Sequence, residues 1–172
     1  MSLVYHPNEI LNTKCEDFDF QNPQADLHEL KKEMFEAMKK HLGVGISAPQ
    51  LGYNFRVFCM LNTSTNNVAS RNMLAANPEV VEVLEGGEVE MWEGCLSVPD
   101  VLLNISRPYK IKARWTNEHG KKVEEVLVGM TARCFLHELD HLNGIMFYEH
   151  VSPIKWKEAQ AEAEARKQKA NA

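Results

Sequence analysis

The stretch TARCFLHELDHL, residues 131–142, decides the fold because it predicts a helix that carries a compact set of reactive groups. The pair Asn143-Gly144 follows it and would end the helix in the manner of a C-terminal cap. His137 and His141 stand four residues apart, so their imidazoles lie only about 40° apart around the helix and can share one ion. Glu138 lies beside that face and can reach a water on the ion without being a ligand. The pattern indicates metal-assisted hydrolysis, although a short motif can also arise by chance on an exposed helix.

A catalytic tetrahedral metal site needs a third protein ligand, and the stretch WEGCLS, residues 92–97, supplies a candidate thiolate in Cys95. Cys95 comes just after a β-like stretch, with Gly94 allowing close backbone approach and Pro99 ending the segment. Taken alone, Cys95 would be interpreted as a buried and inert thiol, but beside the histidine helix it becomes the predicted third ligand. Cys134, on the histidine helix itself, is the alternative ligand.

Composition indicates an ordinary soluble globular protein of about one domain. The chain has 172 residues, a hydrophobic fraction of 44% and a formal net charge of -5, so direct nucleic-acid binding is not expected. No apolar run approaches the roughly 20 residues that cross a bilayer, and the first ten residues lack a secretory signal, which favours a cytoplasmic protein without membrane contact. The four cysteines form no C-x-x-C pair, and Cys15 and Cys59 are interpreted as packing residues.

The remaining pattern predicts an α+β fold, with antiparallel strands packed around the metal-binding helix. Asn22-Pro23 is typical of an N-cap and a first helical residue, and Ser152-Pro153 opens a last helix. Strands are expected at residues 55–61, 79–84, 109–115 and 122–128, separated by turn formers such as 62–67 and 119–120. The helix after Asn22 is expected to end near residue 42 and to bury one apolar stripe: Leu27, Leu30, Met34, Met38 and Leu42.

A third segment, GVGISAPQ at residues 43–50, follows that first helix and is crowded with small residues that would let a ligand backbone come close. For Gly43 the need for positive φ in a turn is explanation enough. For Gln50 a functional role is favoured, because an amide N–H near a polarised carbonyl could help to stabilise an oxyanion.

Taken together and in this order, GVGISAPQ, EGCLS and HELDH resemble the three signature motifs of the peptide deformylase family, which removes the N-formyl group from new polypeptides. The resemblance spans about residues 4–148. It implies that Cys95, His137 and His141 bind one divalent metal and that Glu138 is the acid and base. It also implies that Gln50 and the backbone N–H of Leu96 bind the oxyanion. Similar enzymes use iron(II) natively, while zinc, nickel and cobalt also suit the predicted ligands.

The substrate implied by the resemblance is a formylated nascent peptide, which could add as a strand beside Gly45 and place its methionine in one apolar pocket. Arg133 could line the methionine pocket or pair structurally with a nearby carboxylate. Asp140 is expected to be a structural partner of Arg107. The residues predicted to bind substrate are Val44, Gly45, Gly94, Met130, Arg133 and Cys134.

Two residues depart from the family pattern. Ser47 stands where an alanine is usual, and Leu136 stands where glutamine commonly precedes the first histidine. Neither is a predicted ligand, so the departures bear on packing around the site and on its metal preference or stability.

The chain is expected to form one catalytic domain at residues 1–150, followed by a helical extension at 151–172 that could fray in part. The extension is rich in Ala, Glu and Lys, so a solvated helix is favoured over docking to a partner such as the ribosome.

Two other functions remain open from the sequence. One is a zinc peptidase, because metalloproteases share the H-E-x-x-H pattern, although a distant cysteine ligand counts against it. The other is a structural zinc module without catalysis, in which Cys95 and Cys134 both join the histidines and close the shell.

Overall fold

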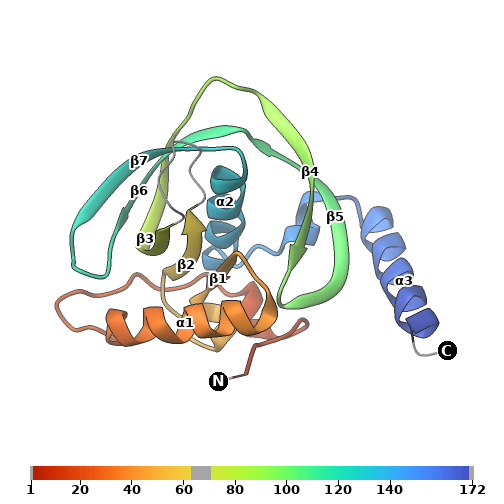
Figure 1. Cartoon of the computed structure of the whole chain (residues 1–172), viewed down its shortest axis with the longest axis horizontal. Coiled ribbons are helices and arrows are strands. Elements are labelled where there is room, and N and C mark those ends of the chain that lie inside the picture. The colour runs from red at the N-terminus through yellow and green to blue at the C-terminus, as the bar shows by residue number, and fades with distance from the viewer. Residues whose placement is uncertain (1, 63–70, 171–172) are drawn as a thin grey trace.

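The computed structural model describes residues 2–62 and 71–170, which form an α+β fold (Figure 1). The helices are α1 (Leu27–His41), α2 (Met130–Leu142) and α3 (Pro153–Ala170), with short 3-10 helices η1 (Glu9–Asn12), η2 (Ala48–Leu51) and η3 (Phe147–His150). The strands are β1 (Gly45–Ser47), β2 (Val57–Asn62), β3 (Arg71–Val83), β4 (Glu88–Cys95), β5 (Val98–Pro108), β6 (Lys110–Thr116) and β7 (Lys122–Val128).

The strands form a five-stranded sheet in the order β1-β2-β3-β6-β7 and a separate hairpin of β4 and β5. Neighbouring strands pair antiparallel throughout both sheets. The predicted α+β class with antiparallel strands is therefore confirmed.

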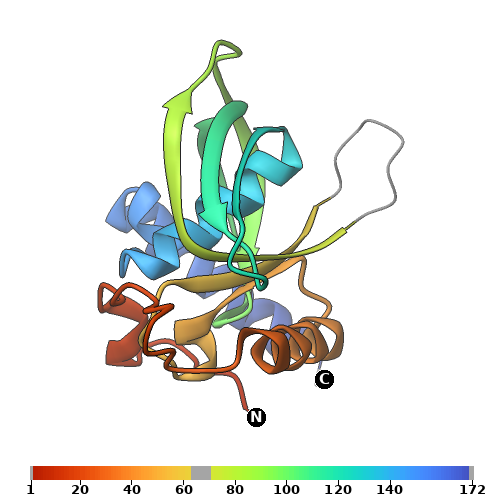
Figure 2. The same ribbon diagram turned by 90° about the vertical axis from the view of Figure 1, so that its left-hand side faces the viewer.

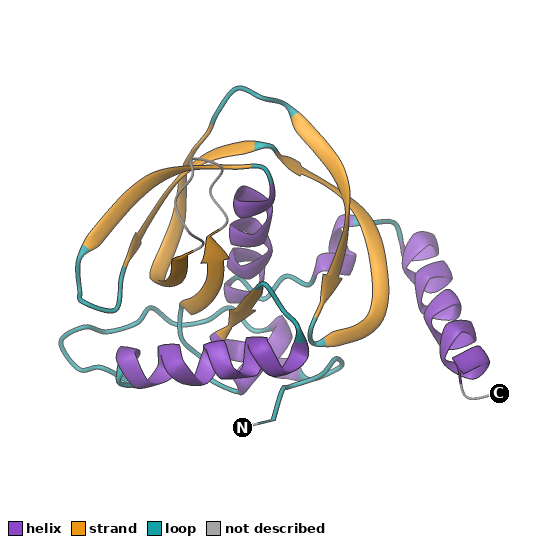
Figure 3. Cartoon of the chain, in the orientation of Figure 1, coloured by secondary structure: helices purple, strands orange, loops and turns teal. Residues whose placement is uncertain are grey.

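Helix α2 is enclosed between strands, whereas α1 and α3 lie at the periphery (Figure 3). Its Phe135 is fully buried and contacts the rings of Phe58 on β2 and Trp115 on β6. This packing fixes the helix against the large sheet and leaves its histidine face toward the β4–β5 hairpin. The predicted central helix is confirmed, beginning one residue earlier than expected.

Helix α1 begins later than the sequence suggested. The side chain of Asp26 accepts hydrogen bonds from the backbone N–H groups of His28 and Glu29, so Asp26 is the N-cap. The predicted cap, Asn22, instead donates its side-chain amide to Asp19 within a bend. An Asn-Pro pair also favours turns, and here the turn prevails over helix initiation.

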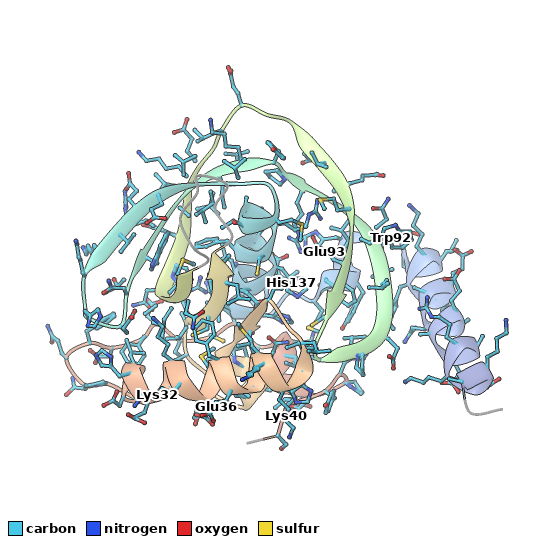
Figure 4. All side chains as sticks on the ribbon, viewed as in Figure 1. Lys32, Glu36, Lys40, Trp92, Glu93 and His137 are labelled. Atoms are coloured by element: carbon cyan, nitrogen blue, oxygen red, sulfur yellow. The ribbon has the colours of Figure 1, made fainter. Side chains whose placement is uncertain are left out.

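Leu42 was predicted to be the last residue of the buried stripe of α1, and this was wrong. Leu42 adopts a left-handed conformation with φ of 56° and is 92% exposed. The other four stripe residues are buried as predicted. The opposite face of α1 carries Lys32, Glu36 and Lys40, which point away from the body of the protein (Figure 4).

Several strands differ from the prediction. Strand β3 is 13 residues long, longer than the strand predicted at 79–84. Asn77, with φ of 49°, and Pro78 interrupt the apolar pattern of the sequence, but they do not end the strand. Strands β1 and β5 were not predicted, and the β-like stretch expected before Cys95 is strand β4. Pro99 lies inside β5 rather than ending a segment. The turn at 119–120 is confirmed, while residues 63–67 of the other predicted turn lie outside the described residues.

Helix α3 packs its small residues Ala159 and Ala163 against the apolar face of β5, beside Val101 and Leu103. Figure 2 shows both termini at the same end of the molecule as α1. No helix in the described ranges combines the length and apolar character needed to cross a bilayer.

Candidate metal centre and active site

Helix α2 presents His137 and His141 toward the end of strand β4, where the chain carries Cys95. The two imidazole rings have centroids 5.0 Å apart. The Sγ atom of Cys95 lies 3.2 Å from Nε2 of His141, and one donor atom from each residue lies within 4.8 Å of the others. The fold thus joins the three predicted ligands from two distant segments into a group that can hold a metal ion.

The three side chains lie close enough to shift one another's pKa values. Burial alone would raise the pKa of Cys95, but His141 and His137 beside it lower that pKa to about 5. Burial would also lower the pKa of His137, but Cys95 and Glu93 raise it to about 10. The neighbouring imidazoles therefore favour the thiolate form of Cys95, which is the form that binds a metal. A thiolate with two imidazoles suits a divalent transition metal, and three protein ligands leave a position for water.

Glu138 lies on α2 beside the ligands and is 3% exposed. Its Oε2 atom is buried and has no hydrogen-bond partner among the described residues. Burial raises the pKa of Glu138 to about 7, in spite of the two neighbouring histidines. A carboxyl group with a pKa near neutrality can both accept and release a proton. Glu138 therefore has the properties expected of an acid and base.

Gly45 on β1 gives Glu138 its room. A Cβ atom at Gly45 would lie against the Glu138 carboxylate and only 2.7 Å from Sγ of Cys134. Any larger residue would displace one of these groups, so Gly45 is explained by close packing against α2. The positive φ predicted for Gly43 was wrong: Leu42 takes the left-handed conformation, and a Cβ atom at Gly43 would lie 2.7 Å from Cδ1 of Leu96.

Gln50 sits on η2, which begins where β1 ends, and is 1% exposed. Its Oε1 atom accepts hydrogen bonds from the backbone N–H of Ser47 at 2.9 Å and from the Ser47 hydroxyl at 3.1 Å. Because Oε1 is taken up by two donors, Nε2 points the other way, to Ser97 Oγ at 3.1 Å and Cys95 Sγ at 3.7 Å. Ser47, which stands where an alanine is usual, thus helps to orient the side-chain amide of Gln50. This role was not predicted from the sequence.

Glu93, which lies at the centre of a buried charge network behind the ligands, was not predicted as a site residue. The Glu93 carboxylate accepts a hydrogen bond from Nδ1 of His137 at 3.2 Å and binds Arg107 through both oxygens, at 2.7 and 3.0 Å. Arg133 also pairs with Glu93. Such a partner fixes the ring of a metal-binding histidine and leaves its other nitrogen for the metal. The signal was available, because Glu93 is an acidic residue directly before the motif residues Gly94 and Cys95.

The predicted pairing of Asp140 with Arg107 is confirmed, with Nη1 of Arg107 2.8 Å from Oδ2 of Asp140. The same oxygen lies 2.7 Å from Nε2 of His150. Arg107 therefore bridges Glu93 on β4 and Asp140 on α2, and it ties the cysteine strand to the histidine helix.

A cavity of about 900 Å³ opens beside the metal ligands. Gln50, Leu96, Cys95, His137 and Glu138 line it, together with every residue predicted to bind substrate: Val44, Gly45, Gly94, Met130, Arg133 and Cys134. Arg133 is 4% exposed and paired with Glu93, so its structural role is established, and its contact with substrate stays a prediction.

Cys134 does not join the metal-binding group. Its Sγ lies 3.7 Å from the carbonyl oxygen of Val44, and burial raises its pKa well above the usual value, so it remains a thiol. Cys15 and Cys59 are buried free thiols, consistent with packing roles. A closed structural zinc shell with two cysteines is therefore excluded by the geometry. Three ligands, an adjacent buried carboxyl group and an open cavity define a metal-dependent hydrolase.

Comparison with known proteins specifies the kind of hydrolase. A family model described as polypeptide deformylase matches residues 1–157. The peptide deformylase of Thermotoga petrophila is 41% identical over 76% of this chain and 75% of its own length. That of Aquifex aeolicus is 35% identical over 87% of this chain and 86% of its own.

Solved structures of peptide deformylases also resemble this chain. A peptide deformylase from Legionella pneumophila superimposes with a TM-score of 0.84 at 30% identity, covering 99% of this chain and 96% of that one. A probable peptide deformylase from Synechococcus phage S-SSM7 gives 0.79 at 34% identity, covering 88% and 99%. This chain belongs to the peptide deformylase family, and it is an enzyme of that family rather than a zinc peptidase.

Proposed function

We propose that this chain removes the formyl group from N-formylmethionine at the start of new polypeptides, with Cys95, His137 and His141 holding one divalent metal. The observation that carries this proposal is the buried Glu138 carboxyl group, which stands beside the three ligands at the wall of an open cavity. A structural metal site would need neither the cavity nor the acid.

The metal, when bound, would polarise the formyl carbonyl and lower the pKa of water toward neutrality. Glu138 would accept the proton of the attacking water, because its pKa of about 7 lets it do so near neutral pH. It would then return that proton to the leaving amine nitrogen as the C–N bond breaks. The products are formate and a free N-terminal amine.

The oxyanion formed during attack would receive hydrogen bonds from Gln50 Nε2 and from the backbone N–H of Leu96. Gln50 supports this role because Ser47 fixes its amide orientation, with Nε2 beside the thiolate. Leu96 supports it because it follows the cysteine ligand directly and lines the same cavity.

The methionine side chain would enter the part of the cavity lined by Val44, Met130 and Cys134, while the peptide backbone runs between Gly45 and Gly94. These residues offer apolar surface and room for close backbone approach. Iron(II) is the native metal that we infer, and zinc, nickel or cobalt could replace it in purified protein, because all accept this donor set.

We further infer a cytoplasmic enzyme with a catalytic domain at 1–150 and a helical extension at 151–172. A weak ribosome contact through α3 would rest on its basic end, which carries Arg166, Lys167 and Lys169.

The test is hydrolysis of formyl-Met-Ala-Ser against acetyl-Met-Ala-Ser by protein purified without oxygen, with its metal content measured in parallel. Release of formate from the first peptide, with the acetyl peptide and its internal bonds left intact, would support the proposal. Failure on the formyl peptide with one equivalent of metal bound would overturn it, and internal cleavage would indicate a peptidase.

A further inference from the structure

A histidine outside the metal-binding group stands at the outer end of the buried charge network behind the ligands. His150 is the last residue of η3, and its Nε2 atom lies 2.7 Å from Oδ2 of Asp140. Asp140 is a carboxylate paired with Arg107, so it only accepts hydrogen bonds, and Nε2 of His150 is therefore the donor. The sequence motifs do not include this histidine, and the proposed reaction does not use it.

A series of hydrogen bonds joins His150 to one of the metal ligands. Asp140 accepts from Nη1 of Arg107 at 2.8 Å, and Arg107 donates in turn to both oxygens of Glu93. Glu93 accepts from Nδ1 of His137 at 3.2 Å, and Figure 4 shows these two side chains next to each other. The series therefore connects the surface of the protein with the metal-binding group through side chains of η3, α2, β5 and β4.

The exposed fraction of the side chains falls along this series. The side chain of His150 is 34% exposed and that of Asp140 is 17% exposed, whereas Arg107 and Glu93 are almost fully buried. His150 covers the same oxygen of Asp140 that binds Arg107. Without the imidazole, water would reach that oxygen and compete with the guanidinium for it.

Helix η3 holds His150 in this position. Phe147 of η3 is fully buried, and its ring centroid lies 6.1 Å from that of His137. The carboxylate of Glu149 accepts a hydrogen bond from the backbone N–H of Met146 at 2.7 Å and closes the short helix. Because the backbone is fixed by these contacts, a substitution at position 150 should change the hydrogen bond and leave the fold in place.

The effect on the metal ligand follows from an oxygen atom of Glu93 that two donors share. Oε2 accepts from Nη2 of Arg107 at 3.0 Å and from Nδ1 of His137 at 3.2 Å. Asp140 draws the guanidinium of Arg107 from the other side, through Nη1. If Asp140 turned toward water, the positive charge of Arg107 would be left more fully to Glu93. The carboxylate would then be a weaker acceptor for the imidazole N–H, and the ring of His137 would be held less firmly.

The two histidine ligands differ in how their second nitrogen is held. Nδ1 of His141 is buried and has no hydrogen-bond partner among the described residues, whereas Nδ1 of His137 donates to Glu93. A hydrogen bond of this kind orients a metal-binding imidazole and makes it a better ligand. The charge network therefore reaches the metal centre through His137.

We propose that His150 is a positioning residue for the metal centre. Its N–H holds Asp140 on Arg107, which leaves Oε2 of Glu93 available to the imidazole that binds the metal. This inference rests on the ligand role of His137 in the proposed function. Losing a direct hydrogen-bond partner of a metal ligand lowers metal affinity by about 10–100-fold. Because His150 acts through the intervening side chains, its loss should weaken metal binding less, by about three- to tenfold.

The test is the dissociation constant for Co²⁺, measured by titrating the Co²⁺-loaded enzyme with a chelator. His150→Phe keeps a ring but has no donor, and it should weaken Co²⁺ binding by about three- to tenfold. His150→Gln keeps an N–H donor without the ring, and it should stay within about twofold of the native protein. His119→Phe is the matched control, because the side chain of His119 is 66% exposed and does not contact the network. Its Co²⁺ affinity should be that of the native protein.

Two further measurements separate positioning from a general loss of stability. The visible absorption of bound Co²⁺ depends on the arrangement of its ligands, so the spectrum should change in His150→Phe and stay native in His119→Phe. In an Asp140→Ala background, His150→Phe should cause no further loss of Co²⁺ affinity, because the two residues act in series.

The outcomes distinguish this inference from the proposed function. Native Co²⁺ affinity or a native spectrum in His150→Phe, an equal loss in His150→Gln, or additive losses with Asp140→Ala would each overturn the positioning role and leave deformylation intact. If the native protein holds no Co²⁺, the proposed metal centre itself fails and takes the inference with it.

Discussion

Helices α1 and α2 are both amphipathic, but they bury different chemistry. α1 buries two leucines at its start and two methionines after them, and Asp26 caps its first turn. α2 buries Arg133, Glu138 and His141 along with its apolar residues, and its N-cap residue Gly129 provides no side-chain cap. Burying ionisable groups is costly unless they are paired. The difference indicates that α1 serves the stability of the fold, while α2 gives up some stability to hold reactive groups in place.

The largest effect on activity and metal binding is expected from His141→Ala on α2. Removing one of three ligands should bring the metal content close to background and formate release below detection. Added metal should also no longer raise the thermal unfolding midpoint, because binding to the folded state is lost. Metal analysis and thermal melts check this, and a variant that still holds one equivalent of metal would contradict the ligand assignment.

Glu93→Gln should have the next largest effect, this time on stability. The buried Arg107 and Arg133 would lose their charged partner, which costs about 3 kcal/mol or more in the free energy of unfolding. Denaturant unfolding at neutral pH measures this loss. A variant as stable as the native protein would show that the network behind α2 contributes little.

The same variant gives a pH test whose sign is fixed. Burial would raise the pKa of Glu93, but His137 and Arg107 lower it from 4.5 to about 2. The stability that Glu93 contributes is therefore fully present well above pH 4.5 and is lost as the pH falls toward 2. The gap in unfolding free energy between native protein and Glu93→Gln should narrow across that range. A constant gap would contradict the lowered pKa.

On α1, Met34→Ala should destabilise the fold without touching the chemistry. Met34 is fully buried, and truncating such a residue costs about 2–5 kcal/mol. Because Met34 lies outside the cavity lining, kcat and metal content should remain at native values below the new unfolding midpoint. A large fall in kcat in the folded variant would contradict the claim that α1 contributes to stability and not to the chemistry.

The smallest effect is expected from Ser47→Ala, just after α1. Gln50 would keep the backbone hydrogen bond to its Oε1 atom and lose the one from the hydroxyl group. The loss of one such bond should lower kcat by about two- to tenfold, with KM and metal content unchanged. Steady-state kinetics on formyl-Met-Ala-Ser measure it, and an unaltered kcat would mean that the backbone bond alone fixes the amide.

The three metal ligands and Glu138 could be predicted from the sequence because they lie close together along the chain or within recognisable motifs. His137, Glu138 and His141 lie within one helical turn and a quarter, so spacing alone places them together. Cys95 needed the company of that helix, since nothing local distinguishes it from a packing thiol. The position of Glu93 next to Gly94 and Cys95 marked it as a candidate, but its role could not be assigned, because its partners Arg107 and Arg133 are distant in sequence.

Strand β5 was not predicted, although Leu103 and Ile105 are buried and alternate with exposed residues. The signal is weakened because the hairpin buries the charged residues Glu93 and Arg107 and exposes Trp92 and Leu102. The start of α1 was misplaced because Asn22-Pro23 is compatible with both a cap and a turn.

The most direct test of the central claim is formate release by the Glu138→Gln variant, with its bound metal measured in the same sample. The variant keeps the shape of the side chain and all three ligands, so it should hold one equivalent of metal. Without a group that accepts and returns the proton, its kcat should fall by at least about 100-fold. Near-native kcat with metal bound would contradict the role of Glu138, and loss of the metal would show that Glu138 supports the metal site itself.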